Sequence, residues 1–485
     1  MPHESNFPIS AEIDGSTLKQ VQKKTELHAE MNSPTKEKPT AKSFHHRFSV
    51  EGLALAPTPL KDTAKAFDFE NIIPMSNGRP APEFLPWKEL SMNVTKCDTG
   101  TMSCMKGEDA FDLAEAMDYS LSAGNPKLVN FFTEHVNLTH SPPYRDRQTC
   151  LSIGSTSAIE RALRIFCDRG DSVLVEQYTY PGVTTATDAL GINLIGIKMD
   201  DEGLDPIDLD AKLNSWDAQS GKKPFILYMV PCGQNPTGVT QSLRRRRAIY
   251  QLAEKHDLYI IEDDPYYFIQ LEILLENDAE GTAYQRSLPA SYLSLDVFGR
   301  VLRLDSASKI LAPGLRLGWV TGCAQVIEKF TEQADMSTLA PSGPSQILVH
   351  KLLCEKWAHF GFAKYLKDLS LQYQQRRDIM TAACVEHLPS SLCKWSIPSS
   401  GMFLWIKILS THVLPQSFAD IEERVSEELE EKGVLIGRGS WFWAGSGSTE
   451  ELCFRLTFAA APPRRFEEGI RTFAQVLRKI FAVSE

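Results

Sequence analysis

Short apolar runs separated by longer mixed stretches are the feature that most limits how this 485-residue chain can fold. Six such runs lie between residues 172 and 321, and each is nearly continuous rather than alternating with polar residues. Strands of this kind are buried on both faces, as in a parallel sheet covered by helices on either side. The pattern therefore predicts an α/β large domain at about 110–345. The runs occupy residues 172–176, 193–197, 225–230, 258–261, 301–304 and 317–321.

The remaining segments predict a second domain and a polar arm. A chain of this length is expected to form two domains rather than one. Residues 1–65 are polar and rich in Ser, Thr, Lys and Pro, which is typical of a disordered arm. Residues 346–485 begin with a long helical pattern and end in strand and helix patterns. We expect them to form a small α+β domain together with residues 66–109.

Polar segments follow three of the predicted strands. Asn235 lies in the sequence Asn-Pro-Thr-Gly after the third run, and Asp263 and Asp264 follow the fourth. Ser155 and Thr156 open a helical pattern directly after another short apolar strand. In open α/β sheets, ligands bind beyond the carboxyl ends of the strands. The three segments therefore predict a ligand site at this edge of the sheet.

The segment from Ser306 to Arg316 contains the residues that most narrow the chemistry. Lys309 stands beside the hydroxyls of Ser306 and Ser308, and Arg316 follows seven residues after the lysine. A lysine amine forms Schiff bases with carbonyl compounds and with pyridoxal 5′-phosphate (PLP), while its neighbours can hold a phosphate. Burial and nearby cations lower the pKa of such a lysine toward a useful range. By itself, the segment is equally compatible with a solvated lysine in a Ser-rich loop.

The order of these motifs makes the chain resemble a known family. Asn-Pro-Thr-Gly, then Asp-Asp-Pro-Tyr-Tyr, then Ser-x-Ser-Lys with an arginine seven residues on, is a specific combination. The chain is similar to the class I/II aminotransferases of fold type I, which use PLP. It most resembles the fungal aromatic and 2-aminoadipate aminotransferases and the kynurenine/aminoadipate aminotransferases, from about residue 72 to the C-terminus. The resemblance implies a mostly parallel, seven-stranded sheet with one antiparallel strand in the large domain.

The resemblance implies roles for the residues around the cofactor ring. Lys309 would form the Schiff base with PLP and then carry protons. Asp264 would bind the pyridine nitrogen, because the family motif places this aspartate directly before Pro-Tyr; Asp263 is the competing candidate. Asn235 and Tyr267 would hydrogen bond to the phenolic oxygen of the cofactor.

The phosphate would lie between two segments of the chain. Ser155 and Thr156 stand where a helix begins, so their backbone N–H groups can face an anion. Ser306, Ser308 and Arg316 would complete the phosphate site from the other side. An ordinary helix cap is the alternative for Ser155 and Thr156, and a cap and an anion site share the same geometry.

Further residues match family positions for the substrate and for a second subunit. Tyr180 would stack on the pyridine ring and act in catalysis, although a lone tyrosine is more often a core or surface residue. Arg455 would bind the substrate α-carboxylate through two parallel hydrogen bonds. Gly78 would allow close approach of the backbone to the substrate, and Asn235 would also contact it. Tyr119 would reach the phosphate of the neighbouring subunit, which implies a homodimer with shared active sites.

The resemblance implies an aminotransferase with a ping-pong reaction. The amino group of an aromatic L-amino acid (Phe, Tyr or Trp), of kynurenine or of 2-aminoadipate would pass to a 2-oxo acid such as 2-oxoglutarate. A PLP-dependent lyase or synthase is an open alternative, because one fold hosts several reactions. A non-catalytic regulator that senses PLP is a second alternative. The N-terminal segment has no helix-turn-helix pattern and the chain is acidic, which argues against the regulator.

Whole-chain properties argue against several other classes of protein. The net charge of −11 disfavours nucleic acid as a ligand, and the basic residues 244–247 are expected on a solvated helix face. No apolar run approaches the roughly 20 residues of a membrane span, and the first residues have no apolar signal core, so we expect a cytoplasmic protein. Ten scattered cysteines predict buried thiols and no metal site. Residues 440–443 are compatible with an aromatic substrate wall or with core packing.

Overall fold

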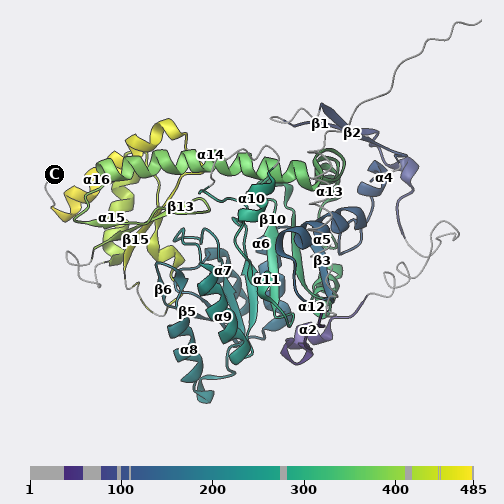
Figure 1. The fold of residues 1–485 in the computed structure, drawn as a ribbon, viewed down its shortest axis with the longest axis horizontal. Helices are drawn as coiled ribbons and strands as arrows, with labels where there is room; N and C mark the ends of the chain where they lie inside the picture. The colour runs from purple at the N-terminus through teal and green to yellow at the C-terminus, as the bar shows by residue number, and fades with distance from the viewer. Residues whose placement is uncertain are drawn as a thin grey trace, which may run out of the picture.

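The computed structural model describes residues 38–57, 78–94, 100–108, 111–272, 281–409, 418–445, 447, 449 and 451–482. A seven-stranded and a four-stranded sheet organise most of these residues, and the long helix α14 (Ala358–His387) runs along both parts of the molecule (Figure 1). Within the described ranges, no helix is long and apolar enough to cross a membrane. The nine cysteines in these ranges are all free, and eight of them are buried.

A seven-stranded sheet with the order β3-β11-β10-β9-β8-β4-β5 forms the centre of the large domain. Strand β11 runs antiparallel to both of its neighbours, and the other neighbouring strands are parallel. The expected mixed sheet with one antiparallel strand is confirmed, and all six apolar runs form strands. The strands are β3 (Arg147–Ser152), β4 (Ser172–Glu176), β5 (Asn193–Ile197), β8 (Ile226–Met229), β9 (Tyr259–Asp263), β10 (Val301–Ser306) and β11 (Gly318–Cys323).

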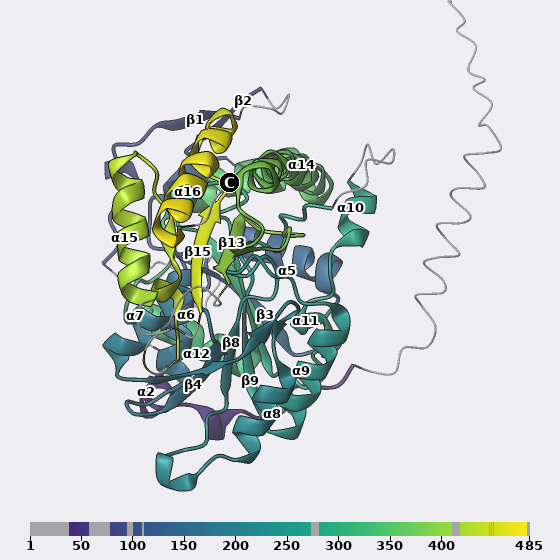
Figure 2. The same cartoon turned by 90° about the vertical axis from the view of Figure 1, so that its left-hand side faces the viewer.

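Helices cover both faces of this sheet, which explains why its strands are apolar throughout. Every residue of β8, β9 and β10 is buried. Figure 2 shows α6, α7 and α12 on one side of the sheet and α5, α9 and α11 on the other. These helices are α5 (Pro126–His140), α6 (Ser155–Phe166), α7 (Pro181–Leu190), α9 (Leu243–Lys255), α11 (Tyr292–Leu295) and α12 (Ala324–Asp335); α8 (Pro206–Asn214) packs beside α9.

A four-stranded antiparallel sheet with the order β12-β13-β15-β14 forms the centre of the C-terminal part. Helices α14 and α16 pack together beside it, and α15 packs on α16 (Figure 1). This part has the α+β character that the sequence predicts for residues 346–485. Its elements are β12 (Cys393–Lys394), β13 (Phe403–Ile408), α15 (Phe418–Glu431), β14 (Gly437–Arg438), β15 (Leu452–Thr457) and α16 (Phe466–Phe481).

The hairpin of β1 (Glu89–Asn93) and β2 (Thr101–Met105) adds no strand to the C-terminal sheet. It is a separate two-stranded sheet, and Figure 1 draws it near the opposite end of α14. A small separate core joins Cys104 of β2 to α4 (Leu113–Ala116) and to α13 (Gly343–His350). The described residues of the segment 66–109 therefore contact α4 of the predicted large domain and α13, which spans the predicted boundary between the two domains.

Residues 38–57, part of the arm that the sequence predicts to be largely disordered, pack against the large domain. Phe44 and Phe48 are buried, with ring centroids 5.0 Å from a tyrosine of β9 and 5.8 Å from a phenylalanine of α6. Their burial stabilises a segment whose overall composition is polar. Residues 1–37 and 58–65 of the predicted arm lie outside the described residues.

Candidate active site

A cavity of about 240 Å³ lies at the carboxyl ends of the central strands. Ser155 begins α6 directly after β3, Asn235 follows β8, and Asp263 and Ser306 are the last residues of β9 and β10. Because the carboxyl ends of these strands meet at one edge of the sheet, the structure brings the predicted segments together. The lining residues are Ser155, Thr156, Tyr180, Val230, Asn235, Asp263, Pro265, Tyr266, Ser306, Ser308, Lys309, Pro313 and Arg316.

One corner of the cavity has the features of an anion site. Arg316 lies over the N-terminus of α6, and its Nη1 is 3.3 Å from the Ser308 hydroxyl. The backbone N–H of Ser308 donates to Ser306 Oγ at 3.2 Å. Gly154 precedes the helix with φ +87°, and a Cβ there would lie 2.5 Å from Arg316 Nη2, so glycine is needed for this close approach. A guanidinium, two hydroxyls and a helix N-terminus together suit a phosphate.

Lys309 lines the same cavity and is half-buried. Burial, with the charges of Arg455 and Arg316, lowers the pKa of its amine. A lowered pKa increases the neutral fraction of a lysine at neutral pH, and only the neutral amine is a nucleophile or a base. The alternative of a solvated lysine in a Ser-rich loop does not fit this position.

Asp263 and Asp264 follow each other in sequence, but only Asp263 lines the cavity. Successive side chains at a strand point to opposite sides, so one position cannot substitute for the other. Asp263 Oδ2 accepts a hydrogen bond from the Tyr228 hydroxyl at 2.7 Å. Its Oδ1 is buried and makes no hydrogen bond among the described residues. Burial raises the pKa of Asp263 to about 6, and the hydroxyls of Tyr228 and Ser155 oppose this rise.

The structure contradicts the expectation that Asp264 and Tyr267 face the ligand site. Asp264 Oδ2 lies 3.3 Å from Nη1 of Arg303, on the side away from the cavity. The Tyr267 hydroxyl donates to a backbone carbonyl at 2.7 Å, and its ring lies 4.5 Å from the same guanidinium. Asp263 and Tyr266 line the cavity instead. The cavity therefore contains one aspartate and one tyrosine of the motif, each one position before the residue that the sequence predicts.

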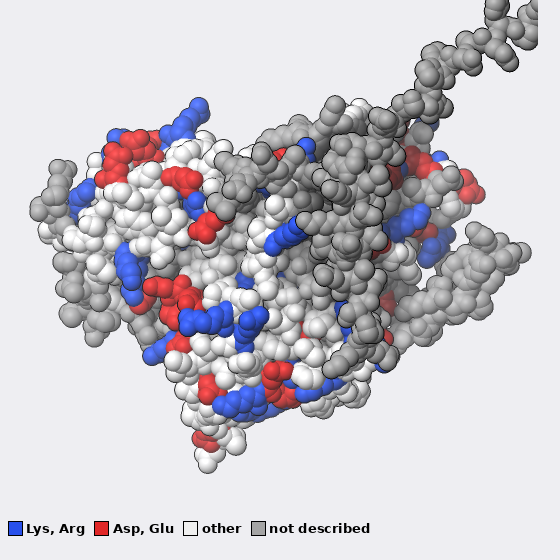
Figure 3. Space-filling view, in the orientation of Figure 1, with Lys and Arg blue, Asp and Glu red and all other residues white. Residues whose placement is uncertain are grey.

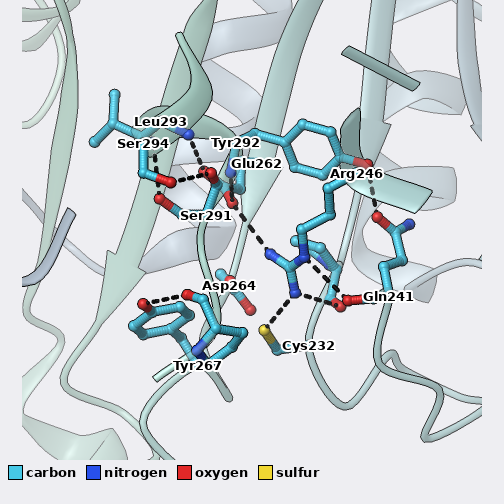
Figure 4. A network of polar contacts seen from close by, with 12 residues as sticks. Cys232, Gln241, Arg246, Glu262, Asp264, Tyr267, Ser291, Tyr292, Leu293 and Ser294 are labelled. Atoms are coloured by element: carbon cyan, nitrogen blue, oxygen red, sulfur yellow. Dashed lines mark hydrogen bonds and ion pairs between the residues drawn. The ribbon is translucent and has the colours of Figure 1, made fainter. Parts of the chain in front are cut away.

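Arg246 is buried within α9, so the expectation that residues 244–247 lie on a solvated face is wrong at this position. Figure 4 shows its guanidinium between Cys232 and Glu262. Its Nη2 donates to Cys232 Sγ at 3.0 Å, and its Nη1 lies 3.9 Å from Glu262 Oε1. The carboxylate of Glu262 also accepts from the first backbone N–H groups of α11 at 2.8 and 3.1 Å. This arginine stabilises the sheet behind the cavity.

The neighbouring arginines of α9 form surface ion pairs. Arg244 pairs with Glu202 at 2.9 Å, and Arg245 pairs with Asp200 at 2.7 Å. On the face drawn in Figure 3, basic and acidic side chains lie next to one another. Such an arrangement does not provide the one-sided basic surface that a nucleic acid backbone requires.

Asn235 connects the cavity to Arg455 of β15. Arg455 Nη1 donates to Asn235 Oδ1 at 2.7 Å. Its guanidinium lies 4.5 Å from the ring of Phe403 and 4.7 Å from that of Phe442, so two aromatic rings fix its plane. Burial lowers the pKa of Arg455. A planar guanidinium held in this way is oriented for a carboxylate ligand.

Tyr180 lines the cavity at the start of α7, with its hydroxyl 3.4 Å from Thr156 Oγ1. Gly182 lies against its ring, and a Cβ at that position would clash with the ring atoms.

Gly182 and Tyr228 are residues that the sequence reasoning missed. A glycine in the first turn of a helix was a usable signal for Gly182, whereas a tyrosine inside an apolar strand looks like ordinary core.

Three predicted features lie away from the cavity. Tyr119 is 60% exposed, and Gly78 is exposed, with no described atom within 4 Å of the point that a Cβ would occupy. In the segment 440–443, Phe442 is buried beside the arginine of β15, whereas Trp441 is 55% exposed. No residue of this segment lines the cavity, so the segment is partly core and partly surface.

Comparison with known proteins assigns the family. Residues 91–473 match the model of the family described as aminotransferase class I and II. An aminotransferase named swnA from Metarhizium robertsii is 44% identical over 91% of this chain and 93% of its own length. An aromatic amino acid aminotransferase of Schizosaccharomyces pombe is 34% identical over 91% of this chain and 98% of its own length.

Two solved structures agree with this assignment. The aminotransferase Aro8 of Candida albicans has a TM-score of 0.85 and 32% identity, covering 92% of this chain and all of its own. The kynurenine aminotransferase of Pyrococcus horikoshii, solved in complex with PMP, has a TM-score of 0.67 and 27% identity, covering 76% of this chain and 84% of its own. The chain belongs to the class I and II aminotransferase family.

Proposed function

We propose that this chain is a PLP-dependent aminotransferase that takes an amino group from an aromatic L-amino acid and passes it to a 2-oxo acid such as 2-oxoglutarate. The observation that carries the proposal is the content of one cavity. It holds the amine of Lys309, a buried aspartate oxygen without a partner at Asp263, and the anion site around Arg316. These are the three groups that an aldehyde, a pyridine nitrogen and a phosphate require.

The residues present fit PLP at every polar group of the cofactor. The unpartnered Oδ1 of Asp263 is an acceptor for a protonated ring nitrogen. Asn235 and Tyr266, which line the cavity, would bind the phenolic oxygen, and Tyr180 would stack on the ring. The phosphate would be held by the N-terminus of α6, with Ser155 and Thr156, and by Ser306, Ser308 and Arg316.

Bound PLP supplies an electron sink, which allows the Cα–H bond of an amino acid to break. Lys309 Nζ would take the Cα proton and return it, since its lowered pKa favours a neutral amine. The carboxylate of Asp263 would keep the ring nitrogen protonated. Arg455, held by Asn235 and two aromatic rings, would bind the α-carboxylate of each substrate in the same orientation.

The substrate class is supported by the relatives. One is named an aromatic amino acid aminotransferase, and one solved neighbour is named a kynurenine aminotransferase. Both donors present a large ring next to the same α-amino and α-carboxylate groups. A relative from Bos taurus is named a kynurenine/alpha-aminoadipate aminotransferase, so kynurenine and 2-aminoadipate are the next donors to compare with phenylalanine, tyrosine and tryptophan.

We also propose a homodimer with shared active sites. Tyr119 is exposed in the single chain, which leaves its hydroxyl accessible to the phosphate site of a second subunit. Gly78, also exposed, would approach the substrate in the assembled enzyme. The cytoplasmic location expected from the sequence stays a prediction.

The test is a half-reaction without an acceptor. Purified holoenzyme mixed with L-phenylalanine alone should convert its PLP absorption to that of pyridoxamine phosphate and release one phenylpyruvate per site. Lys309→Ala should lose this conversion, whereas Lys329→Ala, whose amine is bound by Glu332 on α12, should keep it. Steady release of ammonia without an oxo acid would replace the proposal with lyase chemistry. An unreactive spectrum with every amino acid named above would refute it.

A further inference from the structure

Tyr228 is a buried group that the proposed reaction does not use. It lies on β8, is 1% exposed and does not line the cavity. Its hydroxyl donates to Asp263 Oδ2 at 2.7 Å. Burial, together with the charge of Asp263, raises the pKa of Tyr228 well above its ordinary value, so the hydroxyl stays a neutral donor. A buried hydroxyl is costly unless it is bonded, and here its partner is a residue of the site.

The hydrogen bond from Tyr228 makes the two oxygens of Asp263 different from each other. Oδ2 is occupied by Tyr228, whereas Oδ1 is buried and makes no hydrogen bond among the described residues. The Ser155 hydroxyl also lowers the pKa of Asp263, but it makes no hydrogen bond there within the distance that Tyr228 reaches. The buried guanidinium of Arg303 does not hold Asp263, because Arg303 directs its hydrogen bonds to Asp305 at 2.8 and 3.0 Å and to Asp264 at 3.3 Å. A carboxylate turns freely about its terminal bond unless a partner fixes it. The hydrogen bond from Tyr228 therefore fixes the orientation of the carboxylate, and with it the direction of the free oxygen.

The fold holds this donor rigidly. Strands β8 and β9 are neighbours in the parallel sheet, with Tyr228 opposite Ile261, two residues before Asp263. Side chains two residues apart on a strand share a face, so the hydroxyl reaches the strand end from within the sheet. A donor on a buried central strand moves less than one on a loop, which favours a precise orientation of its partner.

We propose that Tyr228 is a positioning residue that holds Asp263 Oδ2 and so directs Oδ1 toward the ring nitrogen of PLP. This inference rests on the proposed function. Tyr228 touches neither cofactor nor substrate and acts through Asp263, as outer partners orient ligands in other sites. Its loss should therefore affect contacts of the ring nitrogen and leave those of the phosphate and the aldehyde group unchanged.

The experiment compares two cofactors on one variant. PLP and 1-deaza-PLP, in which a C–H group replaces the ring nitrogen, are titrated into the full-length apoenzyme of the wild type and of Tyr228→Phe. We expect Tyr228→Phe to weaken PLP binding about tenfold, the size of one hydrogen bond to a charged group, and to change 1-deaza-PLP binding less than about twofold. Equal losses for both cofactors, or no loss for either, would overturn the proposal.

A matched control separates this effect from the loss of any buried tyrosine hydroxyl. Tyr250 is 6% exposed and donates to the buried carboxylate of Asp296 at 3.0 Å, away from the cavity. The Tyr250 hydroxyl also accepts a hydrogen bond from the backbone N–H of Val297 at 3.1 Å, so Tyr250→Phe should lower thermal stability at least as much while leaving both cofactor affinities unchanged. An equal loss of PLP affinity in Tyr250→Phe would assign the effect to general destabilisation and overturn the role of Tyr228.

A second measurement applies if Tyr228→Phe does not fold. Replacing Tyr228 by 3-fluorotyrosine keeps the ring and the hydroxyl and makes the hydroxyl a stronger donor. With ¹⁵N-labelled PLP bound, the chemical shift of the ring nitrogen should move, and it should stay unchanged with 3-fluorotyrosine at Tyr250. An unmoved shift would overturn the inference. Failure of the wild-type apoenzyme to bind PLP would instead refute the proposed function, so the two failures are distinguishable.

Discussion

The two sides of the chain at the end of β9 carry similar carboxylates in different surroundings. On the cavity side, Asp263 is bonded by the neutral hydroxyl of Tyr228. On the other side, Asp264 shares Arg303 with Glu262 at 3.2 Å and Asp305 at 2.8 Å. A carboxylate with a neutral partner can still accept a proton or a cationic ligand, whereas one paired with arginine mainly holds the structure together. Of these two adjacent aspartates, Asp263 is therefore available to a ligand, whereas Asp264 stabilises the structure.

Replacing each aspartate by asparagine in turn tests whether the two carboxylates differ in function. Asp263→Asn should lower kcat for transamination by about 10²- to 10³-fold, because an amide cannot keep a ring nitrogen protonated. Asp264→Asn should lower kcat less than about tenfold but lower the free energy of unfolding by about 2 kcal/mol, since it removes one partner of Arg303. Steady-state kinetics and urea unfolding of both variants measure the contrast. The reverse pattern would return the catalytic role to Asp264.

The sequence could predict the sheet and the location of the site, because both depend on patterns longer than one residue. Continuous apolar runs give buried strands whatever their exact ends, and polar segments after such strands meet at one edge. The choice between Asp263 and Asp264 depends instead on a single residue of strand register. Because side chains alternate, a shift by one position moves the carboxylate to the other side. The motif itself contains two consecutive aspartates and two consecutive tyrosines, so it does not fix that register.

The sequence also could not predict side-chain contacts between segments that are far apart in the chain. Arg246 lies in a run of four arginines, and its burial follows from the inner face of α9, which it shares with Ile249, Tyr250 and Ala253. The partners that stabilise it come from other strands, such as Glu262 of β9. The polar composition of the N-terminal segment also gave no sign that Phe44 is buried. The burial of the Phe44 and Phe48 rings stabilises the packing of this segment, although most residues around them are polar.

The contribution of the buried ion pairs around Asp264 to stability is tested by replacing Arg303. Arg303 is fully buried and pairs with three carboxylates. Arg303→Met should lower the free energy of unfolding by about 3 kcal/mol, because it leaves buried negative charges without a partner. Arg244→Met, which breaks an exposed pair with Glu202, should change it by less than about 1 kcal/mol. Equal effects in urea unfolding would show that the buried cluster is not a stabilising element.

Asp263 should give the apoenzyme a pH-dependent stability of its own. Burial raises the pKa of Asp263 to about 6 in the folded apoenzyme, above the value of an unfolded aspartate. A folded state that binds its proton more tightly loses stability as pH rises through that pKa, and the loss is complete above it. Between about pH 5 and 7, the wild-type apoenzyme should therefore lose about 1 kcal/mol more unfolding free energy than Asp263→Asn, which cannot titrate. Subtracting the two proteins cancels the other buried carboxyls, such as Glu176 and Asp264, whose pKa values burial also raises. Parallel stability curves in urea at both pH values would mean that Asp263 is already ionised at the lower pH, and that the bond from Tyr228 outweighs the cost of burying its charge.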